Sequence, residues 1–287
     1  MKVGLFIVGA PKAGTTSLYH YLSEHPEVFM SREKETDFFS NEELKELSSY
    51  YKSKSVASLD AYKLQFEGAT DAKILGEGSV SYLYYPKVPV KIKEYNPSSK
   101  IIIMLRHPVD RAYSHYLMDY RMGLIDVSFE EVMNGKGIEA NKVFYQQCIE
   151  LGFYYAQVKR YLDVFGASNV HLIEYESFKS NTSEEMQKVF EFIDIDLDFS
   201  PKINKVHNRF LMPSNNYLKK LYAQVWLRKV LVFILPNNVV EKVKGVFFKQ
   251  SKPKLSSVLR NQLLEIYAED ISQLEKILNL DLSEWRK

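Results

Sequence analysis

The sequence predicts an α/β fold: a three-layer sandwich with a central parallel sheet and a P-loop-like phosphate-binding strand-loop-helix. Three continuous apolar runs, at 3–8, 101–105 and 170–175, have the length and composition of strands buried on both faces. Segments with helical spacing alternate with these runs. Such alternation favours a parallel sheet covered by helices on both faces.

The first strand and helix enclose a short loop. The strand is the run VGLFIV at 3–8, which ends at Gly9. A helix is expected over 16–25, because its apolar residues recur at helical spacing and Pro26 stops it. The loop between them therefore lies at a helix N-terminus.

The later strands and helices follow the same alternation. The second strand, IIIML at 101–105, is followed by a turn at Pro108 and then a helix with Asp110 in its first turn. The third strand is VHLIEY at 170–175. Apolar residues at i, i+3 and i+4 predict further helices over 153–165, 184–193 and 257–278.

We expect a single domain over 1–287, in which 196–254 is a variable, mostly helical basic insertion. Within it, residues 217–254 contain nine Lys or Arg and one acid, although the net charge of the chain is only +2. This segment could form a lid, a track for an acidic polysaccharide or a peripheral membrane contact, or its lysines could simply be solvated. Nucleic acid is not an expected partner, because no recognised binding module accompanies the basic segment. Residues 40–72 are a second expected insertion.

The composition limits which cellular compartment and which kinds of site we expect for this protein. Cys148 is the only cysteine, which excludes an internal disulfide and a cysteine-based zinc cluster. The first strand begins by Val3, which leaves no room for a leader, and the longest apolar stretch, 230–235, is far below the ~20 residues that span a bilayer. We therefore expect a cytoplasmic protein that begins at Met1. The oligomeric state is left open.

The loop after the first strand is a candidate phosphate site. A nucleotide triphosphatase loop reads GxxxxGK[ST], whereas here Gly9 and Gly14 have that separation but Lys12 lies inside the loop. Backbone N–H groups and the helix dipole at such a loop attract an anion. Hydroxyl donors follow at Thr15, Thr16 and Ser17.

A second anion site is expected on the neighbouring strand. The run 101–105 ends in Arg106 and His107 and supplies no carboxylate for Mg²⁺, which disfavours a nucleotide triphosphatase. Without a metal, protein cations must neutralise the ligand. Arg106 can hold a second phosphate with bidentate geometry, and Ser114 can donate to it. A nucleotide with phosphates at two positions fits this pattern, and no metal site is expected.

Together, PKAGTTSLY and LRHPVDRAYSHY resemble the two signatures of sulfotransferases that use 3′-phosphoadenosine 5′-phosphosulfate (PAPS) and release adenosine 3′,5′-bisphosphate (PAP). The resemblance implies that Arg106 and Ser114 hold the 3′-phosphate. It also implies that the 5′-phosphosulfate is held by Lys12, Ala13, Gly14, Thr15, Thr16 and Ser17.

Further segments resemble the heparan-sulfate-type carbohydrate sulfotransferases. KETDFF at 34–39 resembles the segment that carries the general base, which implies that role for Glu35, with Asp37 as second choice and Glu77 as third. LGEGSVSYLYYP resembles a segment that lines the acceptor cleft, with matches at Glu77, Ser79 and Tyr82. Gly78 stands where the family has a lysine.

The last resembling segment is QSKPKLS at 250–256. It is similar to the basic loop that closes over the nucleotide, with Lys252 and Lys254 as expected donor contacts. A histidine could serve as the general base instead of a carboxylate. However, none of the six histidines falls in the segment expected to face the acceptor. His107, beside Arg106, is expected to be a packing or phosphate contact.

The expected reaction is in-line transfer of a sulfuryl group from PAPS to a hydroxyl or amine of a carbohydrate-type acceptor, a saccharide or glycolipid. Lys12 would stabilise the leaving oxygen and Glu35 would take the acceptor proton. Alternatives are a lipid or small phenolic or alcohol acceptor, and an atypical P-loop small-molecule kinase. A third alternative is a nucleotide-binding regulator without enzymatic activity, and Gly78 is the only residue that favours it.

Overall fold

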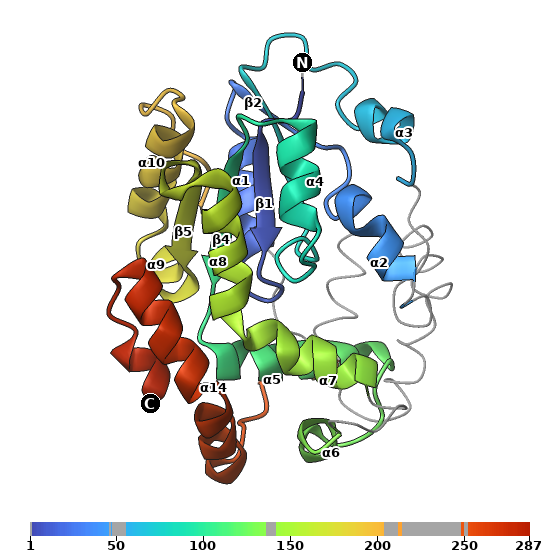
Figure 1. Cartoon of the computed structure of the whole chain (residues 1–287), viewed down its shortest axis with the longest axis vertical. Helices are drawn as coiled ribbons and strands as arrows, with labels where there is room; N and C mark the ends of the chain where they lie inside the picture. The colour runs from blue at the N-terminus through green and yellow to red at the C-terminus, as the bar shows by residue number, and fades with distance from the viewer. Residues whose placement is uncertain are drawn as a thin grey trace.

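A computed structural model describes residues 2–45, 47, 56–135, 142–203, 212–213, 248–249 and 252–287. Its centre is a five-stranded, fully parallel sheet with strand order β2-β3-β1-β4-β5 (Figure 1). The strands are β1 (Leu5–Gly9), β2 (Val28–Met30), β3 (Ile74–Gly78), β4 (Lys100–Leu105) and β5 (Val170–Glu174).

The two central strands are those with the strongest apolar runs. Leu5 to Val8 of β1 and Ile101 to Met104 of β4 have no exposed surface, as expected of strands covered on both faces. They pair with each other in parallel, which confirms that the phosphate loop and Arg106 follow neighbouring strands. The strands β2 and β3 were not predicted, because β2 has three residues and β3, ILGEG, contains two glycines and a glutamate.

Helices form the two outer layers, which confirms the three-layer α/β prediction (Figure 1). On one face His25, which follows α1, packs its ring on Phe190 of α10 at 4.9 Å. On the other face α4 packs against α8. The helices of these layers are α1 (Thr15–Ser23), α4 (Val88–Tyr95), α8 (Tyr154–Phe165), α9 (Tyr175–Ser180) and α10 (Thr182–Ile193).

A further group of helices lies beyond the carboxyl end of β1 or packs on α8 (Figure 1). The C-terminal helix has the bounds predicted for it, 257–278, and contacts both α8 and α5. The group comprises α5 (Pro108–Met122), α6 (Phe129–Met133), α7 (Lys142–Cys148) and α14 (Ser257–Leu278). Short 3-10 turns occur at 38–40, 150–152, 167–169 and 283–286.

The two expected insertions are described only in part. The first contains α2 (Asn41–Lys45) and α3 (Leu59–Leu64). Within 196–254, an antiparallel pair joins β6 (Met212–Pro213) to β7 (Phe248–Lys249). Residues 214–247 lie outside the described residues, so the basic helical insertion and the single domain stay predictions.

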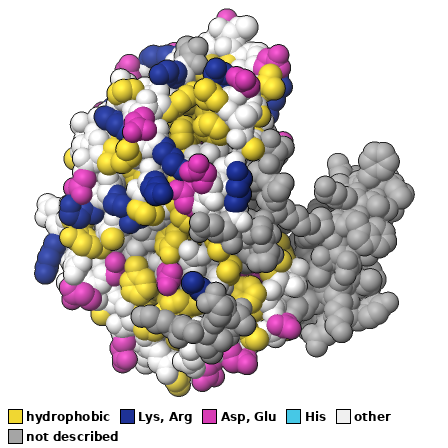
Figure 2. Space-filling model, turned by 45° about the vertical axis from the view of Figure 1, so that its right-hand side comes forward, with side chains coloured by type: hydrophobic (Ala, Val, Ile, Leu, Met, Phe, Trp, Pro, Cys, Tyr) yellow, Lys and Arg dark blue, Asp and Glu magenta, His cyan; other side chains and the backbone are white. Residues whose placement is uncertain are grey.

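Charges of both signs cover the described surface. Figure 2 shows Lys and Arg side chains interspersed with Asp and Glu side chains over the described part of one face. This mixture agrees with a small net charge on the chain. Among the described helices, none combines the length and the apolar character needed to cross a membrane.

Candidate active site

Two glycines shape the loop between β1 and α1. Gly14 caps α1 in the left-handed conformation, with φ 92°, and a Cβ there would lie 2.8 Å from the ring of Tyr175. A Cβ on Gly9 would lie 2.7 Å from Cβ of Leu83, on the segment that follows β3. Both positions therefore require glycine, and the loop backbone is pressed between two neighbouring segments.

Lys12 is the cation inside this loop. It also has a positive φ of 70°, and its Nζ lies 3.4 Å from Sδ of Met118 on α5. Burial and the nearby Arg121 and Arg106 lower the pKa of Lys12 to about 8, although Asp119 acts in the opposite direction. An ammonium group held among other cations is a strong attractor for an anionic ligand.

Arg106, at the end of β4, touches the same loop. Its Nη1 donates to the backbone carbonyl of Lys12 at 3.1 Å, and its guanidinium lies 4.7 Å from the ring centroid of Tyr175. Its Nε is buried and has no hydrogen-bond partner among the described residues. Ser114 is half-buried two turns further along, on α5. The loop after β1 and the end of β4 thus contact each other through Lys12 and Arg106.

The basic loop before α14 approaches from another side. Nζ of Lys252 lies 5.5 Å from the ring centroid of Tyr113. Partial desolvation and the nearby Arg106 lower the pKa of Lys252, although the residue as a whole is exposed. Arg260 of α14 holds this region to the start of α5, since it pairs with Asp110 at 3.1 Å. Lys254 is exposed.

His107 has a structural place at the start of α5. Its Nδ1 accepts from the N–H of Val109 at 3.3 Å, and Nε2 lies 3.2 Å from Nη2 of Arg260. Burial lowers the pKa of His107, which favours the neutral ring. A neutral imidazole accepts at one nitrogen only, so Nδ1 accepts from Val109, while Nε2 carries the proton and lies beside Arg260 without accepting from it. The ring therefore caps the helix and packs beside Arg260, which agrees with the packing role expected for it.

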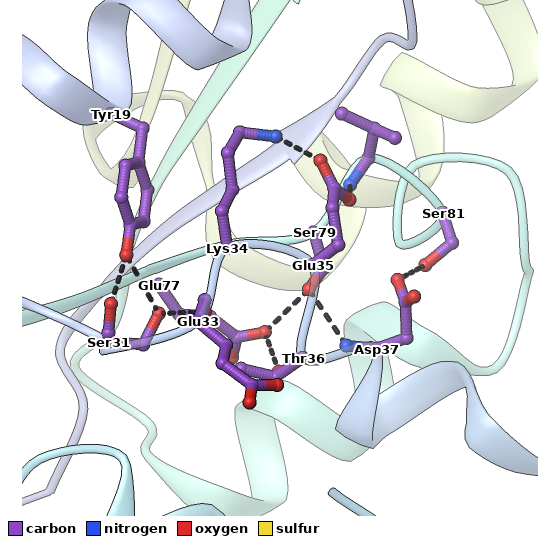
Figure 3. A network of polar contacts seen from close by, with 11 residues as sticks. Tyr19, Ser31, Glu33, Lys34, Glu35, Thr36, Asp37, Glu77, Ser79 and Ser81 are labelled. Carbon is purple, nitrogen blue, oxygen red and sulfur yellow. Dashed lines mark hydrogen bonds and ion pairs between the residues drawn. The ribbon is translucent and has the colours of Figure 1, made fainter. Parts of the chain in front are cut away.

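The predicted base Glu35 lies in a loop that packs on the end of β3 (Figure 3). One carboxylate oxygen pairs with Lys34, and Oε2 accepts from the N–H of Val80 at 2.8 Å. The N–H of Glu35 donates to the carbonyl of Gly78 at 2.9 Å. Since Val80 O would lie 3.3 Å from a Cβ on Gly9, the base loop and the phosphate loop are anchored on one segment.

Asp37 is more enclosed than Glu35. It is buried with a positive φ of 51°, and Ser81 donates to its Oδ1 at 2.7 Å. Its backbone N–H donates to Oγ of Ser79 at 3.0 Å. These contacts keep Asp37 turned into the protein (Figure 3).

Glu77, Ser79 and Tyr82 lie behind the Glu35 loop rather than in front of it. None of the three has any exposed surface, and the hydroxyls of Ser79 and Tyr82 both donate to the Glu77 carboxylate, each at 2.7 Å. A direct contact of these side chains with an acceptor stays a prediction. Gly78 faces Tyr19, whose ring would lie 3.2 Å from a Cβ, so a larger residue there would have to displace that ring slightly.

Two residues of this region were missed by the sequence analysis. Tyr175 contacts both Gly14 and Arg106, but it lies 161 and 69 positions from them, in a run interpreted only as a strand end. Lys34 was regarded as part of a charged stretch, yet it is the cation that pairs with Glu35. Glu33 and Glu35 flank it, so charge pattern alone could not show which carboxylate it selects.

Cofactor candidates other than a nucleotide find little support in the described residues. In the described part of the chain, no group of three or more His, Cys, Asp or Glu side chains is arranged to hold a metal ion. Cys148 is a free, buried thiol whose pKa is raised by burial.

Comparison with known proteins agrees with this geometry. The chain is 27% identical over 195 residues to human bifunctional heparan sulfate N-deacetylase/N-sulfotransferase 2, covering 66% of this chain and 22% of that protein. It is 22% identical to the membrane-associated sulfotransferase kil1 of Dictyostelium discoideum, covering 76% and 62% of the two chains. The chain thus spans about a fifth of the length of the heparan sulfate relatives that it matches.

Solved structures agree at the level of the fold and, in one case, of sequence. A sulfotransferase from Alicyclobacillus acidocaldarius matches over 100% of both chains with a TM-score of 0.76 and 28% identity. A mouse sulfotransferase complexed with PAP matches with a TM-score of 0.50 and 16% identity over 94% and 84% of the two chains, which shows the fold alone. The sulfotransferase domain family matches residues 3–273. The chain belongs to the sulfotransferase domain family.

Proposed function

We propose that this protein transfers a sulfuryl group from PAPS to a hydroxyl or amine of a carbohydrate-type acceptor. The observation that carries the proposal is the meeting of Lys12 and Arg106, where Nη1 of Arg106 donates to the carbonyl of Lys12 at 3.1 Å. One anion site on each of two neighbouring parallel strands suits a nucleotide with two phosphate positions. Membership of the sulfotransferase domain family supports the reaction class.

The residues present fit such a donor. Lys12 and Lys252 both have lowered pKa values, in part because each lies near Arg106, and an anion between them would relieve that repulsion. The buried Nε of Arg106 has no partner among the described residues, which leaves a donor for a phosphate oxygen. PAPS supplies the activated sulfuryl group. We assign its 5′ end to Lys12 and residues 13–17 and its 3′-phosphate to Arg106 and Ser114.

The chain supplies charge stabilisation and proton transfer. Lys12, fixed in the loop, stabilises negative charge that develops on the leaving oxygen. Glu35 receives the acceptor proton, and Lys34 and the N–H of Val80 orient its carboxylate. In this chain Lys34 is the cation next to the base, whereas Gly78 stands at the position where the family has a lysine.

Sequence similarity supports a carbohydrate acceptor. The relatives named as heparan sulfate N-deacetylase/N-sulfotransferases align with this chain over about two thirds of its length. The Glu35 loop resembles the acceptor-facing segment of that branch. Saccharides and glycolipids are therefore the first acceptors to examine.

The test is a transfer assay with radiolabelled sulfate in PAPS over desulfated heparin, glycolipids and simple phenols. We expect labelled saccharide from the wild-type protein and a loss of several orders of magnitude for Lys12→Ala, because that change removes charge from the leaving oxygen. Lys93→Ala, a surface lysine on α4, is the matched control and should transfer normally. If no acceptor is labelled and PAP does not bind, the proposal fails. If only the phenols are labelled, the acceptor is a small phenolic molecule rather than a carbohydrate.

A further inference from the structure

The side chain of Glu77 is the centre of a buried network that the proposed reaction does not itself use. The carboxylate has no exposed surface, although an ionised carboxylate is costly to bury. Four hydroxyls donate to it: Thr36, Ser79 and Tyr82 to Oε1, and Tyr62 to Oε2 at 2.6 Å. Burial raises the pKa of Glu77, and these four hydrogen bonds offset only part of that rise.

Two of these hydroxyls also hold the backbone of the Glu35 loop. Oγ of Ser79 accepts from the N–H of Asp37 at 3.0 Å, and the hydroxyl of Tyr82 accepts from the N–H of Phe39 at 3.2 Å. A third, Thr36, belongs to the loop itself. The Glu77 carboxylate is therefore joined to the loop at residues 36, 37 and 39. Figure 3 shows the links at Thr36 and Asp37.

The direction of each hydrogen bond follows from the carboxylate. A hydroxyl has one proton, so when it donates to Glu77 only its lone pairs remain for the loop N–H groups. An ionised carboxylate only accepts, and here Oε1 accepts from the three hydroxyls next to the loop while Oε2 accepts from Tyr62. A glutamine at 77 could keep its oxygen at the Oε1 position and so preserve the three bonds next to the loop. A methionine, which has nearly the same length and no carboxylate, would leave these hydroxyls free to turn away from the loop N–H groups.

The loop needs this support because its backbone is strained. Glu35 and Asp37 have positive φ values of 63° and 51°, a conformation that costs about 1–2 kcal/mol per residue. Such geometry persists only where surrounding contacts determine it. The contacts that do so here are the carbonyl of Gly78, the hydroxyls of Ser79 and Tyr82, and the N–H of Val80.

We propose that Glu77 is a positioning residue for Glu35: its buried carboxylate orients the hydroxyls that hold the Glu35 loop in its strained form. The inference rests on the proposed role of Glu35 as base. It places Glu77, Ser79 and Tyr82 behind the base, where their effect on the acceptor is indirect.

The first measurement is hydrogen exchange of the 35–40 peptide, which needs no acceptor. In Glu77→Met we expect faster exchange at the amides of Asp37 and Phe39, with the phosphate loop unchanged. A matched pair keeps the inference testable where that variant is unstable. Tyr82→Phe removes a Glu77 donor and a loop acceptor, whereas Tyr62→Phe removes only a donor, so faster loop exchange is expected for Tyr82→Phe alone. Equal effects from the pair, or unchanged exchange in Glu77→Met, would overturn the proposal.

The second measurement separates positioning from general damage, with desulfated heparin as the acceptor. Glu77→Met should lower kcat by about tenfold or more, because small misplacements of a base cost that much, while the KM for PAPS stays within about twofold. In a Glu35→Gln background the same change should add nothing, since the group it positions is already absent. A full additional loss there overturns the role of Glu77 but leaves the base intact. Full turnover by Glu35→Gln overturns the base and the role of Glu77 together.

Discussion

The lowered pKa of Lys12 makes a quantitative prediction for donor binding. With a pKa of about 8 in the free protein, Lys12 is about nine-tenths charged at pH 7 and about one-tenth charged at pH 9. A bound phosphate raises the pKa of Lys12, so affinity must fall as the pH rises through the free-protein value. The expected loss of PAP affinity between pH 7 and pH 9 is about tenfold, or about 1.4 kcal/mol.

Isothermal titration calorimetry with PAP at pH 7, 8 and 9 and constant ionic strength measures this change. The phosphates of PAP have second pKa values of about 6 and gain charge with pH, which acts weakly in the opposite direction. Lys12→Met should bind weakly at every pH without the tenfold fall, and Lys12→Arg, which stays charged, should bind with little pH dependence. A flat wild-type profile, or the same slope in wild type and Lys12→Met, would refute the reasoning.

Three further substitutions test the packing around the site. Gly14→Ala should lower stability by about 1–3 kcal/mol in thermal unfolding, because φ is 92° and the new Cβ meets the ring of Tyr175 at 2.8 Å; an unchanged melting temperature would contradict that geometry. Arg106→Lys should weaken PAP binding by about tenfold in calorimetry while stability is kept, since the planar fork is lost and the charge is not; unaltered affinity removes Arg106 from the donor site. Trp285→Ala should lower the free energy of unfolding by about 3–5 kcal/mol in denaturant unfolding, because the indole is fully buried and donates to Glu174 at 3.0 Å. A loss below about 1 kcal/mol would mean that the C-terminal turn contributes little to stability.

Local sequence patterns predicted much of the fold. The apolar runs at 3–8 and 101–105 became the two central strands because only strands buried on both faces tolerate unbroken apolar sequence. The helix 257–278 kept its bounds because its periodic apolar face is long and Ser256 caps it. The strand β3 could not be predicted from its sequence, because it contains a glutamate and two glycines. Its place in the sheet depends on its neighbours rather than on its own composition.

By itself the sequence determined the α/β class, the glycine-bounded loop with Lys12 inside it, and Arg106 at the end of a second strand, because these features depend on short-range spacing. Only the tertiary structure decided which groups meet. It set Tyr175 against Gly14 and Arg106, Lys34 against Glu35, and a fully buried Glu77 behind the base loop. Most of these contacts join residues 40 or more positions apart, and the sheet order that brings them together comes from packing of the whole core.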